Sequence, residues 1–576
     1  MKKSLILKIF LGILGVLILL AGILFAIGYF YYGKIIKAQL IETIDRESKG
    51  LYKADIGGLS LDVLNGNLSL TKFRLTPDTA LYRKLHLTDT LSPLLIDLKI
   101  DKFRIHGLQI MELVRNRKVD VERINFLSPE VTIFRMKMPR QTGNDKPREK
   151  MTSIPLPKGL TAIAIREFTI EKAGMEFIDC AGDSVETTIF PVTDISIVNI
   201  LVDSIHKGKI RLFNADDISI TLGGYSIMDK KGMNRISFGE IGISTGKQEV
   251  YIKKFHLEPQ FNSFDYPRKM GYQCDRTEVS ISELRIKRMK MRQLLFEGKL
   301  MAGLVMIDSL LIDDYRDMRV PVKKGMKPPM PQDMLRKLKT YLKIDTVMVK
   351  NGKAIYYEQI LEKPGSIFFD KIDATFTGLT NDSVLLSAGQ VSELRGTTYL
   401  MGQGKLDVTL RFFFGDMKNT FTYSAHIGPM DMTLINSMLS YQMPAKIESG
   451  QLKKLVIPFV KANDDKAQGK LIFYYNDLKV MVEAKEKTTW NKIRTGVINF
   501  AANYLIVNND NPTKSGKLKT GTIYFQRKKE SSIFNFLWKS IFSGLKSTMG
   551  FNSDAQKFMI KAEKQQQKNK QDKTKK

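Results

Sequence analysis

The sequence predicts a mainly β protein, in which an N-terminal transmembrane helix precedes an elongated, curved antiparallel sheet with tandem repeats and few short helices. Three observations predict this fold. The chain begins with one long uncharged run, most of the remainder alternates apolar with polar residues, and two long stretches resemble each other in the order of their features. With 576 residues, 43% of them hydrophobic, the chain is long enough for two or more folded units.

The uncharged run lies between Lys8 and Lys34. As a helix, residues 9–32 would extend over roughly 36 Å, more than the hydrocarbon core of a bilayer, which is about 30 Å thick. A cleaved signal peptide is the alternative, but its apolar region is shorter, and this run ends in an aromatic cluster at 29–32 that suits a membrane interface. We therefore predict a retained single-pass anchor, with the basic N-terminus in the cytoplasm and the bulk of the chain outside it.

Comparing the chain with itself reveals a repeat. The segment TKFRLTPD (71–78) recurs as KKFHLEPQ (253–260), and KFRIHGLQIMELVRNRKV (102–119) aligns with ELRIKRMKMRQLLFEGKL (283–300), at offsets of 182 and 181 residues. Each copy then runs into a stretch rich in proline and lysine. We interpret this as two tandem units, 50–230 and 231–410; the alternative is that β-rich sequences resemble one another by composition alone.

Within the repeats the apolar residues mostly recur at every second position, as in LLIDLKIDKFRI (94–105) and KLDVTLRFFF (405–414). Such alternation predicts strands with one wet and one dry face. Turn signals at 65–67, 172–174 and 350–353 predict hairpins between strands, and hence a meander.

Helical patterns are few, and they occur at 35–48, 79–85, 331–342, 432–440 and 490–505. A long sheet with so little helical cover must fold on itself as a sandwich or curl into a groove, and tandem repeats favour the groove. On the order of 24 strands, spaced by about 4.8 Å, would extend a little over 100 Å. Six residues on the predicted dry face are candidates for contact with acyl chains, although each also fits an ordinary core position: Leu98, Ile100, Ile165, Ile197, Leu410 and Phe412.

These patterns divide the chain into seven parts. They are an anchor (1–33), a linker helix (34–49), the two β-repeat units (50–230 and 231–410), a C-terminal β-rich region (411–530), an amphipathic helix (531–551) and a basic tail (552–576) that we expect to be disordered.

The amphipathic helix has the sequence SSIFNFLWKSIFSGLKSTMG (531–550). On a helical wheel one face carries Phe534, Leu537, Trp538, Ile541, Phe542, Leu545 and Met549, while Phe536 falls outside it. Two central lysines and several serines argue against a membrane span. Joined to the lysine-rich tail, the helix predicts contact with an anionic membrane surface, such as the outer membrane, or with an envelope protein; a cap over the last strands is the alternative.

Catalytic patterns are weak throughout. No two of the five histidines have the spacing of a zinc helix, and both CAGDS (180–184) and GQGK (402–405) are typical of turns. The acidic pairs Asp313–Asp314 and Asp464–Asp465 are more typical of solvated loops than of a cation site. Cys180 and Cys274 are either two free thiols or one disulfide. We therefore predict a protein that is not an enzyme and that has no metal site, cofactor or nucleic-acid partner.

The layout resembles the AsmA-like proteins of Gram-negative envelopes, in a form found in Bacteroidetes-type bacteria. The resemblance is carried by the anchor running into YKADIGGLSLDVLNGNLSLTKFRL (52–75), by the β-rich middle and by the closing segments 428–482, 502–512 and 521–527. It implies an inner-membrane protein whose periplasmic part is a β-groove related to chorein-type lipid-transfer bridges. It also implies a role in phospholipid traffic and outer-membrane integrity. The chain is short for such a bridge.

The leading hypothesis is thus a membrane-anchored groove that binds or conducts phospholipid. The alternative is an envelope assembly scaffold that binds other proteins along its sheet.

Overall fold

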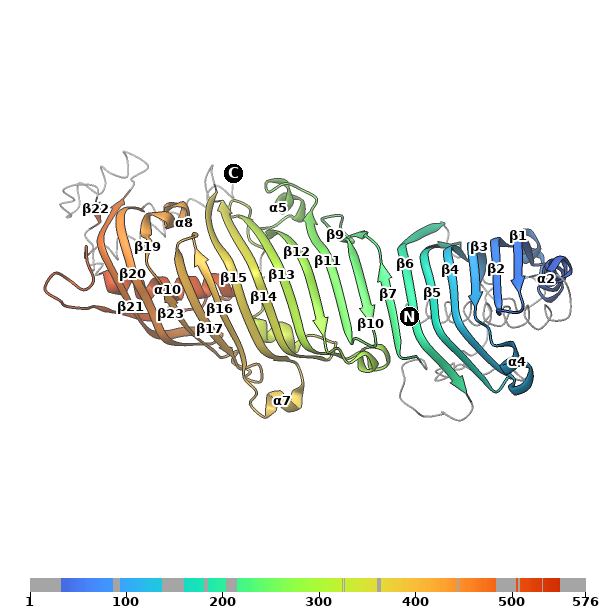
Figure 1. The fold of residues 1–576 in the computed structure, drawn as a ribbon. Helices are drawn as coiled ribbons and strands as arrows, with labels where there is room; N and C mark the ends of the chain where they lie inside the picture. The colour runs from blue at the N-terminus through green and yellow to red at the C-terminus, as the bar shows by residue number, and fades with distance from the viewer. Residues whose placement is uncertain are drawn as a thin grey trace. The chain divides into compact units, whose positions relative to one another are not determined.

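The structure is a computed structural model, shown in Figure 1, and it describes residues 33–85, 94–136, 160–180, 185–203, 215–323, 325, 327–359, 364–442, 445–482, 504–505, 508–530 and 532–549. The predicted anchor at 9–32, the tail at 552–576 and nearly all of the predicted helix at 490–505 lie outside these residues. None of the helices within them is long and apolar enough to cross a membrane. The chain forms two compact units, unit 1 (Met1–Tyr225 and Gly239–Val250) and unit 2 (Ser226–Phe238 and Tyr251–Lys576).

Unit 1 is a sheet in which strands pair in the order β1, β2, β3, β4, β5, β6, β7, β10. Short helices border it. The elements are α2 (Gly33–Glu47), β1 (Tyr52–Asp62), β2 (Asn67–Pro77), α3 (Thr79–Leu85), β3 (Leu94–His106), α4 (Ile110–Asn116), β4 (Lys118–Arg135), β5 (Ala162–Asp179), β6 (Glu186–Asp203), β7 (Asp217–Leu222) and β10 (Glu240–Ser244).

In unit 2, β9 pairs with β11, and a continuous ladder follows the order β12, β13, β14, β15, β16, β17, β18, β20, β21, β23. Its strands are β9 (Asn234–Phe238), β11 (Glu249–Pro259), β12 (Asp275–Lys287), β13 (Leu300–Asp317), β14 (Leu342–Gln359), β15 (Gly365–Thr380), β16 (Ser392–Leu400), β17 (Gly404–Phe412), β18 (Phe421–Ile427), β19 (Met430–Asp431), β20 (Ala445–Ala462), β21 (Lys466–Val482), β22 (Tyr504–Leu505) and β23 (Thr520–Gln526). Its helices are α5 (Asp265–Met270), η2 (Gln293–Glu297), α6 (Pro331–Arg336), α7 (Ser383–Ser387), η3 (Met432–Ile435), α8 (Asn436–Gln442) and α10 (Ile533–Met549), and the short strand β8 (Tyr225–Met228) lies where the units divide.

The fold is mainly β, as predicted, but a purely antiparallel sheet is wrong. Strand β4 pairs parallel with β5, and β13 pairs parallel with β14. A parallel pair needs a long connection that returns the chain to the end where it started. Residues 136–161 and 318–341 are these connections, and they contain the stretches rich in proline and lysine. Alternation of apolar residues is the same for both strand directions, so the pattern alone did not reveal the parallel pairs.

Two of the predicted hairpin turns are β-bulges within long strands. Residues 172–174 lie inside β5 and residues 350–353 inside β14. Lys172 has φ 54° and Asn351 has φ 53°, so each adopts a left-handed conformation that inserts an extra residue into its strand. Since a bulge bends and twists the strand that carries it, these positions contribute to the bent strands visible in each unit (Figure 1).

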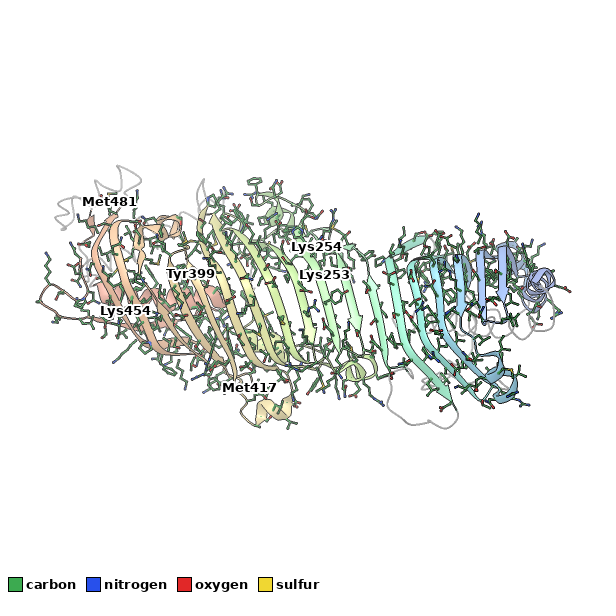
Figure 2. The ribbon with its side chains drawn as sticks, in the orientation of Figure 1. Lys253, Lys254, Tyr399, Met417, Lys454 and Met481 are labelled. Carbon is green, nitrogen blue, oxygen red and sulfur yellow. The ribbon has the colours of Figure 1, made fainter. Side chains whose placement is uncertain are left out.

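The second repeat follows the first in its backbone as well as in its sequence. Strands β2 and β11 have the same length and lie 182 residues apart. Left-handed residues recur at similar offsets of 182, 181 and 179 residues, in Lys72 and Lys254, Ser128 and Ser309, and Lys172 and Asn351. Lys254 is labelled in Figure 2. The compact units do not coincide with the repeats, because β10 pairs with β7 while the preceding strand, β9, pairs with β11. The predicted segments 231–410 and 411–530 both lie largely in unit 2.

One face of the unit 1 sheet forms its hydrophobic core. Leu98, Ile100, Ile165 and Ile197 all belong to this cluster, and they lie on the same face of β3, β5 and β6. Ile165 is only 1% exposed. Apolar residues of α2 and α4 pack against the same cluster. The predicted dry face of unit 1 is therefore buried.

The second large core lies at the C-terminal end of unit 2. Leu410 and Phe412 belong to it, together with side chains of β18, β20, β21 and β23 and with Phe536 of α10. The six residues predicted for the dry face thus divide between two separate clusters, four in unit 1 and two in unit 2.

Candidate functional site

The face of the unit 2 sheet that carries Leu410 continues over β12–β15 as an uninterrupted apolar surface. Cross-strand pairs define it, because Ile281 is opposite Leu310, Ile307 is beside Val349, and Val347 is opposite Phe376. We call this surface the apolar face. It comprises Val279, Ile281, Leu284, Ile286, Val305, Ile307, Leu310, Ile312, Ile344, Val347, Val349, Ala354, Ile367, Phe369, Ile372, Ala374, Phe376 and Leu379.

The apolar face is more accessible than its counterpart in unit 1. Leu98 and Ile100 in unit 1 are buried, whereas Val279 and Ile281, at the matching places in the second repeat, are only partly buried. Among the members of the apolar face on β13 and β14, only Val305 and Ile344 are buried. Burial alone does not distinguish a core position from a ligand contact. The six residues predicted to contact acyl chains are buried, so they are weaker evidence for a lipid site than this accessible surface. The sequence patterns did not single out the accessible surface.

The opposite face of unit 2 mixes charged and aromatic side chains with apolar ones. Lys253 Nζ lies 4.9 Å from the ring centroid of Tyr251, Lys454 Nζ lies 4.8 Å from that of Tyr474, and Lys371 Nζ lies 5.5 Å from that of Tyr399. Lys253, Lys454 and Tyr399 are labelled in Figure 2. In such pairs the lysine ammonium group stays in water while the aromatic ring covers the aliphatic part of the lysine side chain, as expected of a solvated face.

The dimensions of the apolar face suit hydrocarbon chains. From Val305 to Ile312 a strand extends about 23 Å, and β12 to β15 are separated by three interstrand spacings, or about 15 Å. The hydrocarbon layer of one bilayer leaflet is about 15 Å thick. The surface is therefore long enough to cover an acyl chain and wide enough for more than one.

At its C-terminal end the sheet is covered by α10. Phe536 is 1% exposed, with its ring 6.3 Å from that of Phe421, and Ser540, which is fully buried, lies 2.7 Å from the hydroxyl of Tyr423. The helix also covers the edge of β23, because the backbone N–H groups of Thr522 and Tyr524 donate to the hydroxyls of Ser547 and Ser543. Covering an edge strand in this way prevents it from pairing with another chain.

The residues predicted for a membrane or partner interface on α10 separate into two sets. Leu537, Ile541 and Leu545 pack against the hydrophobic core. Phe534 is 80% exposed, and Trp538 and Phe542, which are partly exposed, stack with ring centroids 6.0 Å apart. Phe536, which the helical wheel left outside the apolar face, is the most buried aromatic residue of the helix. The side of α10 that packs against the strands, which we call the seam, also contains the small residues Ser540, Gly544 and Thr548. Their spacing of four is the sequence signal that could have revealed this contact between helix and sheet.

A polar cluster lies on the same side of the sheet as the apolar face, where β12, β13 and β14 reach one end. It consists of Asp275, Thr277, Asp314, Arg316, Tyr356 and Glu358, which are cross-strand neighbours. Arg316 forms a bidentate ion pair with Asp275, Thr277 donates to Asp314 Oδ1 at 2.5 Å, and Tyr356 donates to Glu358 Oε2 at 2.9 Å. Burial, followed by the charge of Asp275, raises the pKa of the Asp314 carboxyl to about 6.

The raised pKa of Asp314 predicts a pH-dependent gain in stability for Asp314→Asn. The ordinary pKa of an unfolded aspartate is about 3.9, so the folded state binds more protons than the unfolded state between about pH 4 and pH 6. The charged carboxylate therefore destabilises the fold increasingly as pH rises through this window. We expect the variant to gain about 1–3 kcal/mol in free energy of unfolding at pH 7.5 and nothing at pH 4, as measured by urea denaturation. Asp308→Asn, at an exposed position of the same strand, is the control; an equal gain at both pH values would contradict the assignment.

The acidic pairs and the cysteines noted in the sequence do not form a metal site in the described residues. Asp313 and Asp314 are consecutive residues of β13, so they point to opposite faces and cannot share a cation, and they lie in a strand where a loop was expected. Asp464 forms an ion pair with Arg527, at 2.6 Å. Both cysteines are free. Within the described part of the chain, no group of three or more His, Cys, Asp or Glu side chains is arranged to hold a metal ion.

The opposite face also has a hollow of about 530 Å³ across β14–β20. Its lining includes Lys350, Asp373, Arg395, Asp407 and His426. Lys350 is paired with Asp373, and Asp407 accepts a hydrogen bond from Thr397. Ion pairs and hydrogen bonds of this kind are typical of a charged sheet surface, so we do not interpret the hollow as a ligand site.

Comparisons with known proteins do not assign the chain to a family: no family model matches it, and no curated protein matches it either.

Proposed function

We propose that this chain is an inner-membrane-anchored envelope protein whose apolar face binds phospholipid through the acyl chains. The single observation that carries the proposal is the accessible apolar surface of β12–β15. Burying apolar area contributes about 25 cal/mol per Å², so a surface of this extent favours an apolar occupant over water. An amphipathic occupant would cover the strands and keep its polar end at their margin.

Three further features support the proposal. The uncharged run at 9–32 would hold the protein at a membrane, a source of phospholipid. The resemblance to AsmA-like proteins implies a periplasmic groove that carries lipid and supports the outer membrane. The remainder of the unit 2 sheet, over β17–β23, packs into a buried core together with side chains of α6 and α10, so the accessible part has a defined end. We infer passive binding or conduction without enzymatic chemistry.

The test counts phospholipids on the purified full-length protein by native mass spectrometry. The variant Ile281→Asn with Leu310→Asn places two amides at an opposed pair on the apolar face. Burying an amide against an acyl chain costs about 1–3 kcal/mol, so we expect the retained lipid to fall by about tenfold or more. Because both proteins carry the same anchor, lipid held by residues 9–32 cancels in the comparison.

The control variant changes the adjacent pair on the opposite face, Ser280→Asn with Leu311→Asn. We expect it to retain as much lipid as the unaltered protein. Equal lipid counts in all three proteins would contradict the proposal, and capture of a defined protein partner in place of lipid would favour the scaffold.

A further inference from the structure

The polar cluster at the end of β12–β14 has no equivalent in the first repeat, although the backbone is the same there. In the first repeat Leu94 is opposite Arg135 and Ile96 is opposite Ile133, and in the second Asp275 is opposite Arg316 and Thr277 is opposite Asp314.

The third strand shows the same change. Phe177 and Asp179 lie beside Ile133 and Arg135 in the first repeat, and Tyr356 and Glu358 lie beside Asp314 and Arg316 in the second. The arginine and its acidic neighbour on this strand are kept, while four apolar residues are replaced by polar ones. The fold does not require these polar residues, since the first repeat forms the same strands without them.

The charge of the second-repeat cluster is unbalanced. Arg135 and Asp179 form a neutral pair, with a nitrogen to oxygen distance of 2.6 Å. In the second repeat one guanidinium, Arg316, faces three carboxylates, those of Asp275, Asp314 and Glu358. Glu358 is only 7% exposed, and Asp314 is partly buried. A cation placed between them would neutralise charge that water screens poorly at this site.

The positions of the carboxylates and of the apolar face indicate which kind of cation would bind. No set of acidic side chains in the described residues converges as metal ligands, which argues against a divalent ion. Arg316 lies four positions after Ile312, the last apolar position of β13 on this face, or about 13 Å along the strand. An amphipath lying on the apolar face would thus place its polar end on the cluster. A primary ammonium, with three donors, matches carboxylates that already accept one bond each from Thr277 and Tyr356.

We propose that the polar cluster is a headgroup subsite that selects phospholipids bearing a primary amine over anionic ones. The inference rests on the proposed function, because it concerns the polar end of the same ligand. Asp314 is the residue whose carboxylate the amine would pair with, and Arg316 would contact the adjoining phosphate.

The test uses the full-length protein, stripped of lipid and incubated with vesicles of equimolar phosphatidylethanolamine and phosphatidylglycerol. Bound lipids are then identified by mass spectrometry. We expect about fivefold enrichment of phosphatidylethanolamine on the unaltered protein, as one partly buried charge pair provides. Asp314→Asn should abolish the enrichment. Thr277→Ile with Asp314→Ile, which installs the residues of the first repeat, should do the same.

Asp313→Asn is the matched control, because Asp313 is the next residue of β13 and points to the opposite face. Its enrichment should equal that of the unaltered protein. Equal binding of both lipids by the unaltered protein, or unchanged selectivity in Asp314→Asn, would overturn the subsite and leave the proposed function standing. Absence of bound lipid from the unaltered protein would overturn both.

Discussion

Gly544→Leu is expected to release α10 from the sheet and destabilise the C-terminal end of unit 2 by about 3 kcal/mol or more. The helix approaches the strands closely at this position. A Cβ atom at Gly544 would lie 2.5 Å from Leu471 Cδ2 and 2.7 Å from Ile523 Cγ1, both of which belong to buried residues. Leucine improves helix propensity by only about 1 kcal/mol, which does not offset this overlap.

Release of α10 has consequences that proteolysis can measure. Phe536 would leave its contact with Phe421, and the hydroxyl of Ser540 would leave Tyr423. The N–H groups of Thr522 and Tyr524 would become free to pair with another chain. We expect new protease cleavage between residues 527 and 549, a lower unfolding midpoint and a greater tendency to aggregate.

The matched control is Phe534→Leu, since Phe534 is 80% exposed on the same helix. It should change the stability by less than about 0.5 kcal/mol. If Gly544→Leu were as resistant to protease as the unaltered protein, α10 would not be docked as described.

The element types were the most predictable part of the fold. Alternating residues located β3, and the amphipathic run predicted at 531–551 contains α10. Both follow from local periodicity, which depends on which face of an element is buried. The backbone match between the repeats, in pairs such as Ser128 and Ser309, shows that the aligned sequences fold alike.

The pairing of strands was less predictable, because it depends on contacts between distant residues. Strand β4 lies beside β5 in parallel, and the alternating pattern of β4 is compatible with either direction. The bulges at Lys172 and Asn351 resemble turns in sequence, because each is followed closely by a glycine, a residue that is typical of turns.

The candidate site was only partly predictable. Sequence alternation identifies Leu98 and Ile281 alike as facing the dry side, but their different accessibility depends on what covers each sheet. On α10 the helical wheel identifies large apolar residues that do pack against the core, such as Leu537, but it leaves out Phe536 and small buried residues such as Gly544. Small residues carry little hydrophobic signal, although they permit the closest approach of helix and strand.

If lipid occupies one face of the unit 2 sheet and not the other, photo-crosslinking in growing cells will label the protein at one face only. Leu310 and Leu311 are adjacent residues of β13 on opposite faces, and Leu311 is 40% exposed. A benzophenone side chain introduced at either position samples one face only. The phospholipids would be labelled with radioactive phosphate.

We expect a phospholipid adduct when the benzophenone replaces Leu310 and essentially none when it replaces Leu311. Equal labelling at the two positions, or adducts to protein but not to lipid at position 310, would contradict this expectation.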